Sequence, residues 1–171
     1  RPCLSCHDGC FNRAHSMRLM SCSVNPQCNR EKEAAFAKAD TQKNCLVIGG
    51  GPAGMEAARV LALRGHHVTL LEKEARLGGM YRWASVPEFK DDGKLLLQWY
   101  EHQMESLHVQ VVVNCEAQPE DSRIAEADVV ICATGSHAFL PPIKGIEHGV
   151  TAVDVLKGTI TAAEETTIIG G

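Results

Sequence analysis

The chain has 171 residues, with 17 Lys or Arg and 21 Asp or Glu, so its formal net charge at pH 7 is −4. Hydrophobic residues make up 44% and charged residues 22%, the usual balance of a globular protein. This composition excludes a strongly basic surface for nucleic acid or an anionic membrane, and no apolar run has the length of a membrane span. We expect a cytoplasmic protein without nucleic-acid or membrane partners.

The first 22 residues hold four of the eight cysteines, spaced as Cys3-x2-Cys6-x3-Cys10-x11-Cys22. Thiols at such intervals can surround one metal centre, and both zinc and a [4Fe–4S] cluster accept four thiolates. Spacing alone does not separate these two centres. Cys28 is a fifth candidate that can take the place of Cys22. We expect residues 1–30 to form an irregular loop that is held mainly by its metal.

Other residues near these motifs have less specific interpretations. Cys45, Cys115 and Cys132 lie in or beside predicted strands, and we expect them to pack in the core. His7 lies between candidate ligands and is interpreted as a loop histidine near the metal, with ligation as the alternative. Trp99 follows a helical pattern, so it is expected to contact the core or another domain rather than stack on a cofactor.

A polar, Ala-rich linker over residues 31–43 precedes an alternation of apolar and amphipathic segments. The predicted strands are Cys45–Ile48, His67–Glu72, Val109–Val113 and Asp128–Ala133. The predicted helices or helical turns are Pro52–Arg64, Asp91–Leu107, Pro119–Ala125 and Asp154–Lys157. Residues 73–90 are expected to be a loop, and Thr166–Ile169 a last strand. This alternation predicts an α/β fold with a parallel, doubly wound sheet.

The motif Gly49-x-Gly51-x-x-Gly54 lies between a predicted strand and a predicted helix. Gly49 permits the tight turn, Gly51 lets the backbone approach a pyrophosphate, and Gly54 lets the helix pack closely on the strand. Pro52 and Ala53 belong to the same turn, at the helix N-terminus. The motif predicts a dinucleotide-binding loop.

Glu72, at the end of the second predicted strand, strengthens this interpretation. A carboxylate at that position accepts hydrogen bonds from ribose hydroxyls, and it disfavours a ribose 2′-phosphate. The alternative is a glycine-rich turn with a surface glutamate. Lys73 follows, and then Gly78-Gly79, whose paired glycines permit close approach to a larger ligand beyond the pyrophosphate. The alternative for these glycines is a flexible loop.

These motifs together resemble a family of large enzymes. Its members join an old-yellow-enzyme-like FMN barrel, a [4Fe–4S] loop and a glutathione-reductase-like FAD and NAD(P)H module; they include 2-enoate reductase, 2,4-dienoyl-CoA reductase and trimethylamine dehydrogenase. The resemblance covers nearly the whole chain, and it rests on segments 1–10, 21–26, 49–54, Glu72-Lys73, Leu77-Gly78-Gly79 and Ala133-Thr134-Gly135. Segments 6–10, 86–91 and 99–101 look closest to the enoate reductase branch.

The resemblance implies a domain order and a set of cofactors. Residues 1–30 would be the [4Fe–4S] loop, 31–43 the linker, 44–165 an incomplete FAD domain, and 166–171 the first strand of a truncated NAD(P)H domain. It implies that Ala133, Thr134 and Gly135 lie near the cofactor, as do Gly78 and Gly79, which favour FAD. The FMN barrel would precede the chain and the NAD(P)H domain would follow it, as parts of the same polypeptide.

The resemblance also implies a route for electrons. NAD(P)H would reduce FAD, the cluster would pass electrons singly to FMN, and FMN would reduce an activated C=C bond. No catalytic residue is predicted within this chain, which is expected to be a fragment that is inactive alone. The alternative is a non-catalytic module with a structural four-cysteine zinc site and an ADP-binding domain. The oligomeric state is left open, with a homo-oligomer as one alternative.

Overall fold

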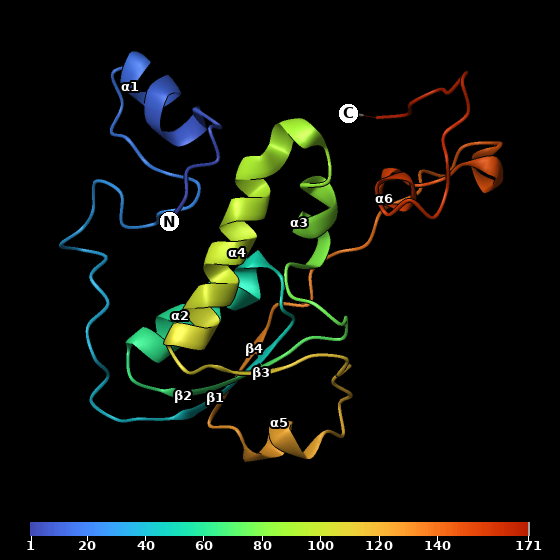
Figure 1. Ribbon diagram of the computed structural model, residues 1–171. Helices are drawn as coiled ribbons and strands as arrows, with labels where there is room; N and C mark the ends of the chain where they lie inside the picture. Colours follow the sequence, from blue (N-terminus) through green and yellow to red (C-terminus); the bar gives the residue numbers. More distant parts are fainter. Residues whose placement is uncertain (171) are drawn as a thin grey trace. The chain divides into compact units, whose positions relative to one another are not determined.

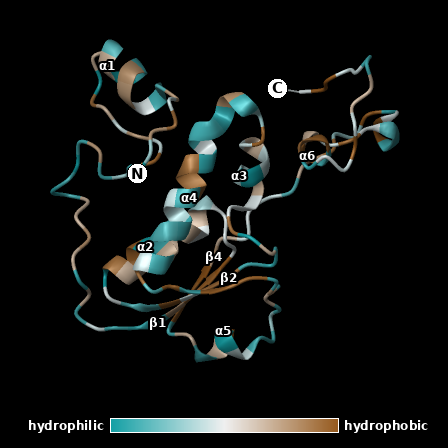
Figure 2. Cartoon of the chain, viewed as in Figure 1, coloured by the Kyte–Doolittle hydropathy of each residue, from teal (hydrophilic) through white to brown (hydrophobic). Residues whose placement is uncertain are grey.

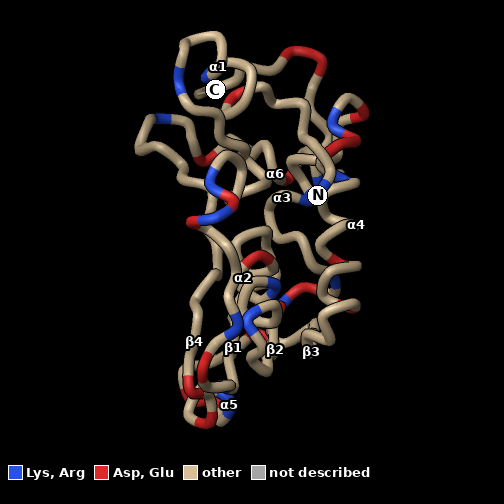
Figure 3. Tube along the Cα trace, turned by 90° about the vertical axis from the view of Figure 1, so that its left-hand side faces the viewer, with Lys and Arg blue, Asp and Glu red and all other residues tan. Residues whose placement is uncertain are grey.

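The computed structural model describes residues 1–170 (Figure 1). It contains two compact units, Arg1–Gly135 and Ser136–Gly171. The first unit therefore groups the cysteine-rich segment with the sheet, and its boundary falls inside the range predicted as one FAD domain. No helix in the described part of the chain is long and apolar enough to cross a membrane. Lys and Arg are interspersed with Asp and Glu along the trace (Figure 3).

A four-stranded parallel sheet in the order β3-β2-β1-β4 organises the first unit. Its strands are β1 (Asn44–Ile48), β2 (His67–Leu71), β3 (Gln110–Val112) and β4 (Val129–Cys132). The chain moves outward from β1 to β3 and then returns to add β4 on the other side of β1. This reversal creates a topological switch point between β1 and β4. The predicted parallel sheet is confirmed, with strand ends within two residues of the prediction.

Helices α2 (Pro52–Leu63) and α4 (Asp91–Ser106) cover one face of the sheet, and α5 (Ser122–Glu126) lies on the other (Figure 1). The fold is therefore doubly wound, as predicted. The strands are strongly hydrophobic, whereas α5 carries mostly polar residues (Figure 2). The core lies between the sheet and the two long helices, and its fully buried members include Val47, Leu70, Met55, Ala58 and Met104.

The region 73–90 is not one continuous loop, so that prediction was wrong. It contains the helix α3 (Gly79–Ala84) and a short 3-10 helix (Glu88–Lys90). The hydroxyl of Ser85 ends α3 by donating to a backbone carbonyl, and a Cβ at Gly93 would lie 2.3 Å from that hydroxyl. Close packing of α3 on α4 therefore stabilises a helix too short to persist alone, and sequence periodicity does not report such packing.

The cysteine-rich segment is more regular than predicted. A π-helical turn (Asp8–Asn12) continues into α1 (Arg13–His15), whereas an irregular loop was expected over residues 1–30. The linker contains one turn, closed by a hydrogen bond from the amide of Ala34 to the carbonyl of Arg30 (2.8 Å), and is otherwise irregular.

The second unit contains a short 3-10 helix (Ile146–His148) and α6 (Ala152–Leu156), which begins with a capping box between Thr151 and Asp154. The strand predicted over Thr166–Ile169 is not formed. A strand needs a neighbour for its backbone hydrogen bonds, and the described residues of this unit provide none. The assignment of 166–171 to an NAD(P)H domain stays a prediction, and Gly171 lies outside the described residues.

Candidate functional site

Three segments that are distant in sequence meet where β1, β2 and β4 end. Residues 49–54 follow β1, Glu72 follows β2, and Ala133 follows β4. Together with residues 77–79 and 134–135, we call them the glycine cradle. They occupy the carboxyl ends of neighbouring parallel strands beside the switch point, which is where open α/β sheets bind their ligands.

The first contact in the glycine cradle joins the turn after β1 to the end of β4. Gly49 has a φ of +108°, and a Cβ there would lie 2.3 Å from the carbonyl oxygen of Ala133. A Cβ at Gly54 would lie 1.8 Å from the carbonyl oxygen of Gly49. A side chain at either position would separate the turn, the helix and the strand, so both must be glycine for this packing.

The start of α2 is open. Gly51 is the residue before the helix, and a Cβ added to it would meet no atom within 4 Å. Pro52 occupies the first helical position and Ala53 is exposed beside it. Amides of the first helical turn have no partner within the helix, and the helix dipole places partial positive charge there. The site therefore has the space and the donors that suit a pyrophosphate.

Glu72 is buried, with 5% of its surface exposed, and both of its carboxylate oxygens accept backbone hydrogen bonds. The amide of Gly50 donates to Oε2 at 2.7 Å, and the amide of Glu74 donates to Oε1 at 2.8 Å. These two bonds tie the end of β2 to the glycine loop. Because each oxygen has two lone pairs, the carboxylate retains capacity for the hydroxyl groups of a ribose. Lys73 is exposed next to it.

Gly78 and Gly79 approach the backbone of the glycine loop closely. The amide of Gly78 donates to the carbonyl of Gly50 at 2.8 Å, and a Cβ at Gly79 would lie 3.1 Å from the Cα of Gly51. The paired glycines were predicted to permit approach to a ligand, and the close approach that the structure shows is to the neighbouring loop. On the other side, Thr134 and Gly135 are exposed, with open space beside Gly135.

The structure does not gather the four predicted metal ligands. Cys3, Cys6 and Cys10 are exposed, while Cys22 and the alternative Cys28 are half-buried. Among the described residues, no group of three or more His, Cys, Asp or Glu is arranged to hold a metal ion. Thiolates commonly converge only as they bind their metal, so their role as ligands stays a prediction.

Backbone contacts nevertheless bring together the segments that contain these cysteines. The amide of Ser21 donates to the carbonyl of Gly9 at 2.7 Å, and the Sγ of Cys6 lies 3.4 Å from the Oγ of Ser23. The hydrogen bond from Ser23, and then one from the backbone at Asp8, lower the pKa of the Cys6 thiol. A lowered pKa favours the thiolate, the form that binds metals. The donor set fits a four-thiolate centre of zinc or iron and sulfide.

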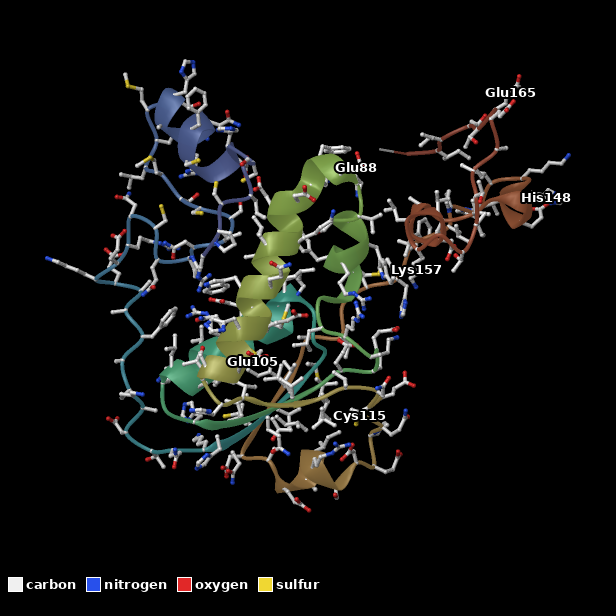
Figure 4. The ribbon with its side chains drawn as sticks, in the orientation of Figure 1. Glu88, Glu105, Cys115, His148, Lys157 and Glu165 are labelled. Carbon is white, nitrogen blue, oxygen red and sulfur yellow. The ribbon has the colours of Figure 1, made fainter. Side chains whose placement is uncertain are left out.

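The other cysteines differ from one another. Cys45 is buried in the core, as predicted. Cys115 is half-buried in the segment after β3 (Figure 4). Arg123 donates a hydrogen bond to its sulfur at 3.1 Å. Cys132 is exposed, so its predicted core position was wrong. It is the last residue of β4, where the strand leaves the sheet.

A charged contact that the sequence did not predict joins the cysteine-rich segment to α2. Arg1 donates to Glu56 at 2.6 Å, and Arg59 donates to the same carboxylate at 2.9 Å. The spacing of Glu56 and Arg59 on one helix was the available signal for part of this contact. No sequence pattern predicted that Arg1 contacts Glu56, because the two residues are 55 positions apart.

Comparisons with known proteins agree with this geometry. The family model described as pyridine nucleotide-disulphide oxidoreductase matches residues 43–171. A cinnamate reductase of Clostridium sporogenes is 46% identical over 171 residues, which is all of this chain and 26% of that protein. An NADH oxidase of Thermoanaerobacter brockii is 39% identical over 179 residues, covering all of this chain and 28% of that protein.

A solved structure of a 2-naphthoyl-CoA reductase in complex with 2-naphthoyl-CoA superimposes with a TM-score of 0.88 and 32% identity. The match covers 95% of this chain and 25% of that one. The chain thus spans about a quarter of the length of these relatives.

Proposed function

Because the chain belongs to the pyridine nucleotide-disulphide oxidoreductase family, we propose that it is the FAD- and [4Fe–4S]-binding segment of a larger reductase. The observation that supports this most directly is the glycine cradle at the switch point, where a helix N-terminus, a buried carboxylate and open space coincide. The cysteine-rich segment belongs to the same compact unit. In this proposal the chain joins two redox sites within one folded body.

The cradle binds FAD through its backbone and one carboxylate. The first turn of α2 beside Gly51 would hold the pyrophosphate, and Glu72 would accept hydrogen bonds from the ribose hydroxyls. The other residues proposed to contact the cofactor or shape its site are Gly49, Pro52, Ala53, Gly54, Lys73, Gly78, Gly79, Ala133, Thr134 and Gly135. Bound FAD supplies hydride chemistry, and a cluster supplies one-electron transfer.

The cluster ligands in this proposal are Cys3, Cys6, Cys10 and Cys22. Cys28 is the alternative fourth ligand. Three of the four thiols are exposed in the structure, so they are free to turn toward a common centre. The contacts of residues 9 and 21 hold the two halves of the loop together before any metal is bound.

The names of the relatives favour a reductase of conjugated C=C bonds. Cinnamate is a carboxylate conjugated to a C=C bond, and 2-naphthoyl-CoA is a conjugated thioester. The proposed overall reaction takes a hydride equivalent from NAD(P)H and a proton from solvent, adds two electrons and two protons across the C=C bond, and leaves NAD(P)⁺. FMN and NAD(P)H bind to other parts of the longer polypeptide, an FMN barrel and an NAD(P)H domain.

The test is metal and flavin analysis of the whole polypeptide, purified without oxygen. We expect about four iron atoms per chain, bound FAD and FMN, and oxidation of NAD(P)H that depends on a cinnamate-type substrate. Zinc in place of iron, together with ADP in place of flavin, would overturn the proposal in favour of a non-catalytic module.

A further inference from the structure

The contact between the cysteine-rich segment and the sheet domain is built around one carboxylate. Glu56 lies on α2, just past the turn that opens onto the glycine cradle. Arg1 Nη2 donates to its Oε1 at 2.6 Å, Arg59 Nε donates to its Oε2 at 2.9 Å, and Arg59 Nη2 donates to its Oε1 at 3.0 Å. Two guanidinium groups therefore share a single carboxylate and join two segments that are 55 residues apart.

An aromatic side chain of α4 completes this arrangement. The guanidinium carbon of Arg1 lies 5.1 Å from the ring centroid of Trp99, and that of Arg59 lies 5.6 Å from it. Arg59 also lies 5.4 Å from the ring of Phe36 in the linker. Such cation–π contacts are strongest where water is excluded. The set of Arg1, Glu56, Arg59 and Trp99, which we call the Glu56 hub, thus joins the cysteine-rich segment, α2 and α4, and its Arg59 also contacts the linker.

The hub is shielded from solvent. The exposed fractions of the side chains are 7% for Arg59, 13% for Arg1 and 24% for Glu56. Although burial acts to raise it, the hydrogen bonds from Arg59 and Arg1 hold the pKa of Glu56 below its ordinary value. Shielded ion pairs are screened little by salt, and removing one partner leaves the other charge unpaired. This contact therefore differs from the exposed pair of Lys94 and Asp91 on α4.

Arg1 holds both ends of the cysteine loop, residues 1–24, through hydrogen bonds. Its Nη2 reaches Glu56, and its Nη1 donates to the carbonyl of Val24. Arg1 and Val24 stand two positions outside Cys3 and Cys22, the outermost proposed ligands. Leu4 and Val24 also pack against the hydrophobic core. The two ends of the loop are thus held at one point of α2, while three of the four thiols between them are exposed.

We propose, resting on the proposed function, that Glu56 and Arg1 are a positioning pair that fixes the cysteine loop relative to the glycine cradle and so controls electron transfer between the two sites. Helix α2 begins at the cradle and carries Glu56 in its early turns, so it acts as a rigid spacer. Sites built on helices and held by hydrogen bonds keep their geometry better than sites on free loops. Neither residue touches a reacting atom in this proposal.

The experiment uses the whole polypeptide and the substitution Glu56→Gln, with Glu105→Gln as the matched control. Glu105 is an exposed glutamate near the C-terminal end of α4, six residues after Trp99 (Figure 4). We measure iron and flavin content, hydrogen–deuterium exchange of residues 1–28, and the rates of flavin and cluster reduction after rapid mixing with NAD(P)H. Freeze-quench electron paramagnetic resonance follows the cluster, and absorbance follows the flavin.

We expect Glu56→Gln to retain FAD and its rate of reduction by NAD(P)H. Exchange in residues 1–28 becomes about tenfold faster, because the loop opens more often. Cluster reduction slows about tenfold, in the range that a small displacement of reacting groups produces. Arg1→Gln should show the same changes in exchange and cluster reduction, and Arg1→Lys should recover most of the wild-type behaviour. The double variant Arg1→Gln/Glu56→Gln should be no more impaired than either single variant. Glu105→Gln should match the wild type.

Two results of the exchange and reduction measurements would overturn the positioning pair, and a third would come from cofactor content. One is wild-type exchange and wild-type cluster reduction in Glu56→Gln; the proposed function then stands, provided that the wild type contains iron and FAD. The other is additive effects of Arg1→Gln and Glu56→Gln, since partners in one interaction do not add. If the wild-type protein contains no iron or no flavin, the proposed function is wrong, and the electron-transfer role of the pair is then wrong as well. If Glu56→Gln loses FAD together with iron, the pair supports the whole unit and the positioning role is wrong.

Discussion

The glycine cradle and the cysteine loop are organised in opposite ways. In the cradle, Glu72 already accepts hydrogen bonds from two backbone amides, and a Cβ at Gly49 or Gly54 would collide with a carbonyl oxygen. In the cysteine loop the ends are fastened at Arg1 and Val24, but the thiols between them do not converge. Met17, in the same loop, is 96% exposed. Under the proposed function, the chain itself preorganises the nucleotide site, whereas the four-thiolate site would take its final geometry only with its metal.

The largest loss of stability should come from adding a methyl group where the backbone packing of the cradle is tightest. In Gly54→Ala the new methyl group would lie 1.8 Å from the carbonyl oxygen of Gly49. Overpacking on backbone cannot relax through a side chain, so we expect a loss of about 3 kcal/mol in stability and little folded protein. Thermal unfolding and FAD content measure this. Gly51→Ala is the packing control, because a Cβ there meets nothing within 4 Å; without FAD it should unfold at the same temperature as the FAD-free wild type. Equal stability of the two variants would contradict the packing argument.

A smaller loss is expected from neutralising the buried carboxylate. Glu72 accepts from the amides of Gly50 and Glu74, and in Glu72→Gln one of these donors faces an NH₂ group. An unsatisfied buried donor costs about 1–3 kcal/mol. We expect weaker FAD binding, measured by fluorescence titration, together with a lower unfolding temperature. The side chain of Glu74 is exposed, and only its backbone amide contacts Glu72. Glu74→Gln should therefore leave FAD binding and the unfolding temperature unchanged. Unaltered FAD binding in Glu72→Gln would remove Glu72 from the proposed site.

Removing the metal should affect only one of the two regions. After chelation of the metal, we expect faster hydrogen exchange in residues 3–22, with the sheet strands unaffected, because those strands do not depend on the thiols. Cys10→Ser should lower iron content and leave FAD content intact. Cys28→Ser should keep its iron, whereas Cys22→Ser should lose it. The reverse result would identify Cys28, and not Cys22, as the fourth ligand. Equal loss of iron and FAD in Cys10→Ser would show that the two regions fold as one unit.

The same contrast explains what the sequence could and could not predict. The strands and the two long helices follow from local apolar patterns, and the turn at Gly49–Gly54 follows from a motif whose spacing is itself steric. The helix Gly79–Ala84 was missed because packing on α4 stabilises it. The Arg1–Glu56 contact was missed because nothing local relates residues so far apart. The strand at 166–169 was predicted from its own residues, although a strand forms only beside a partner.

The smallest effect concerns pH. Glu56 faces Arg1 and Arg59, and it also faces Tyr100, whose pKa burial and the charge of Glu56 raise to about 12. Glu56 is the one carboxylate of the hub, and Glu56→Gln removes it. Since the pKa of Glu56 is lower in the folded state, its contribution is fully present above the unfolded value of about 4.3 and is lost as the pH falls through the lowered folded value. Exchange of residues 1–28 should therefore accelerate below about pH 4 in the wild type beyond the chemical trend seen in Glu56→Gln, in which no carboxylate remains to titrate. Parallel pH profiles for the two proteins would show that the hub does not hold the cysteine loop through this charge.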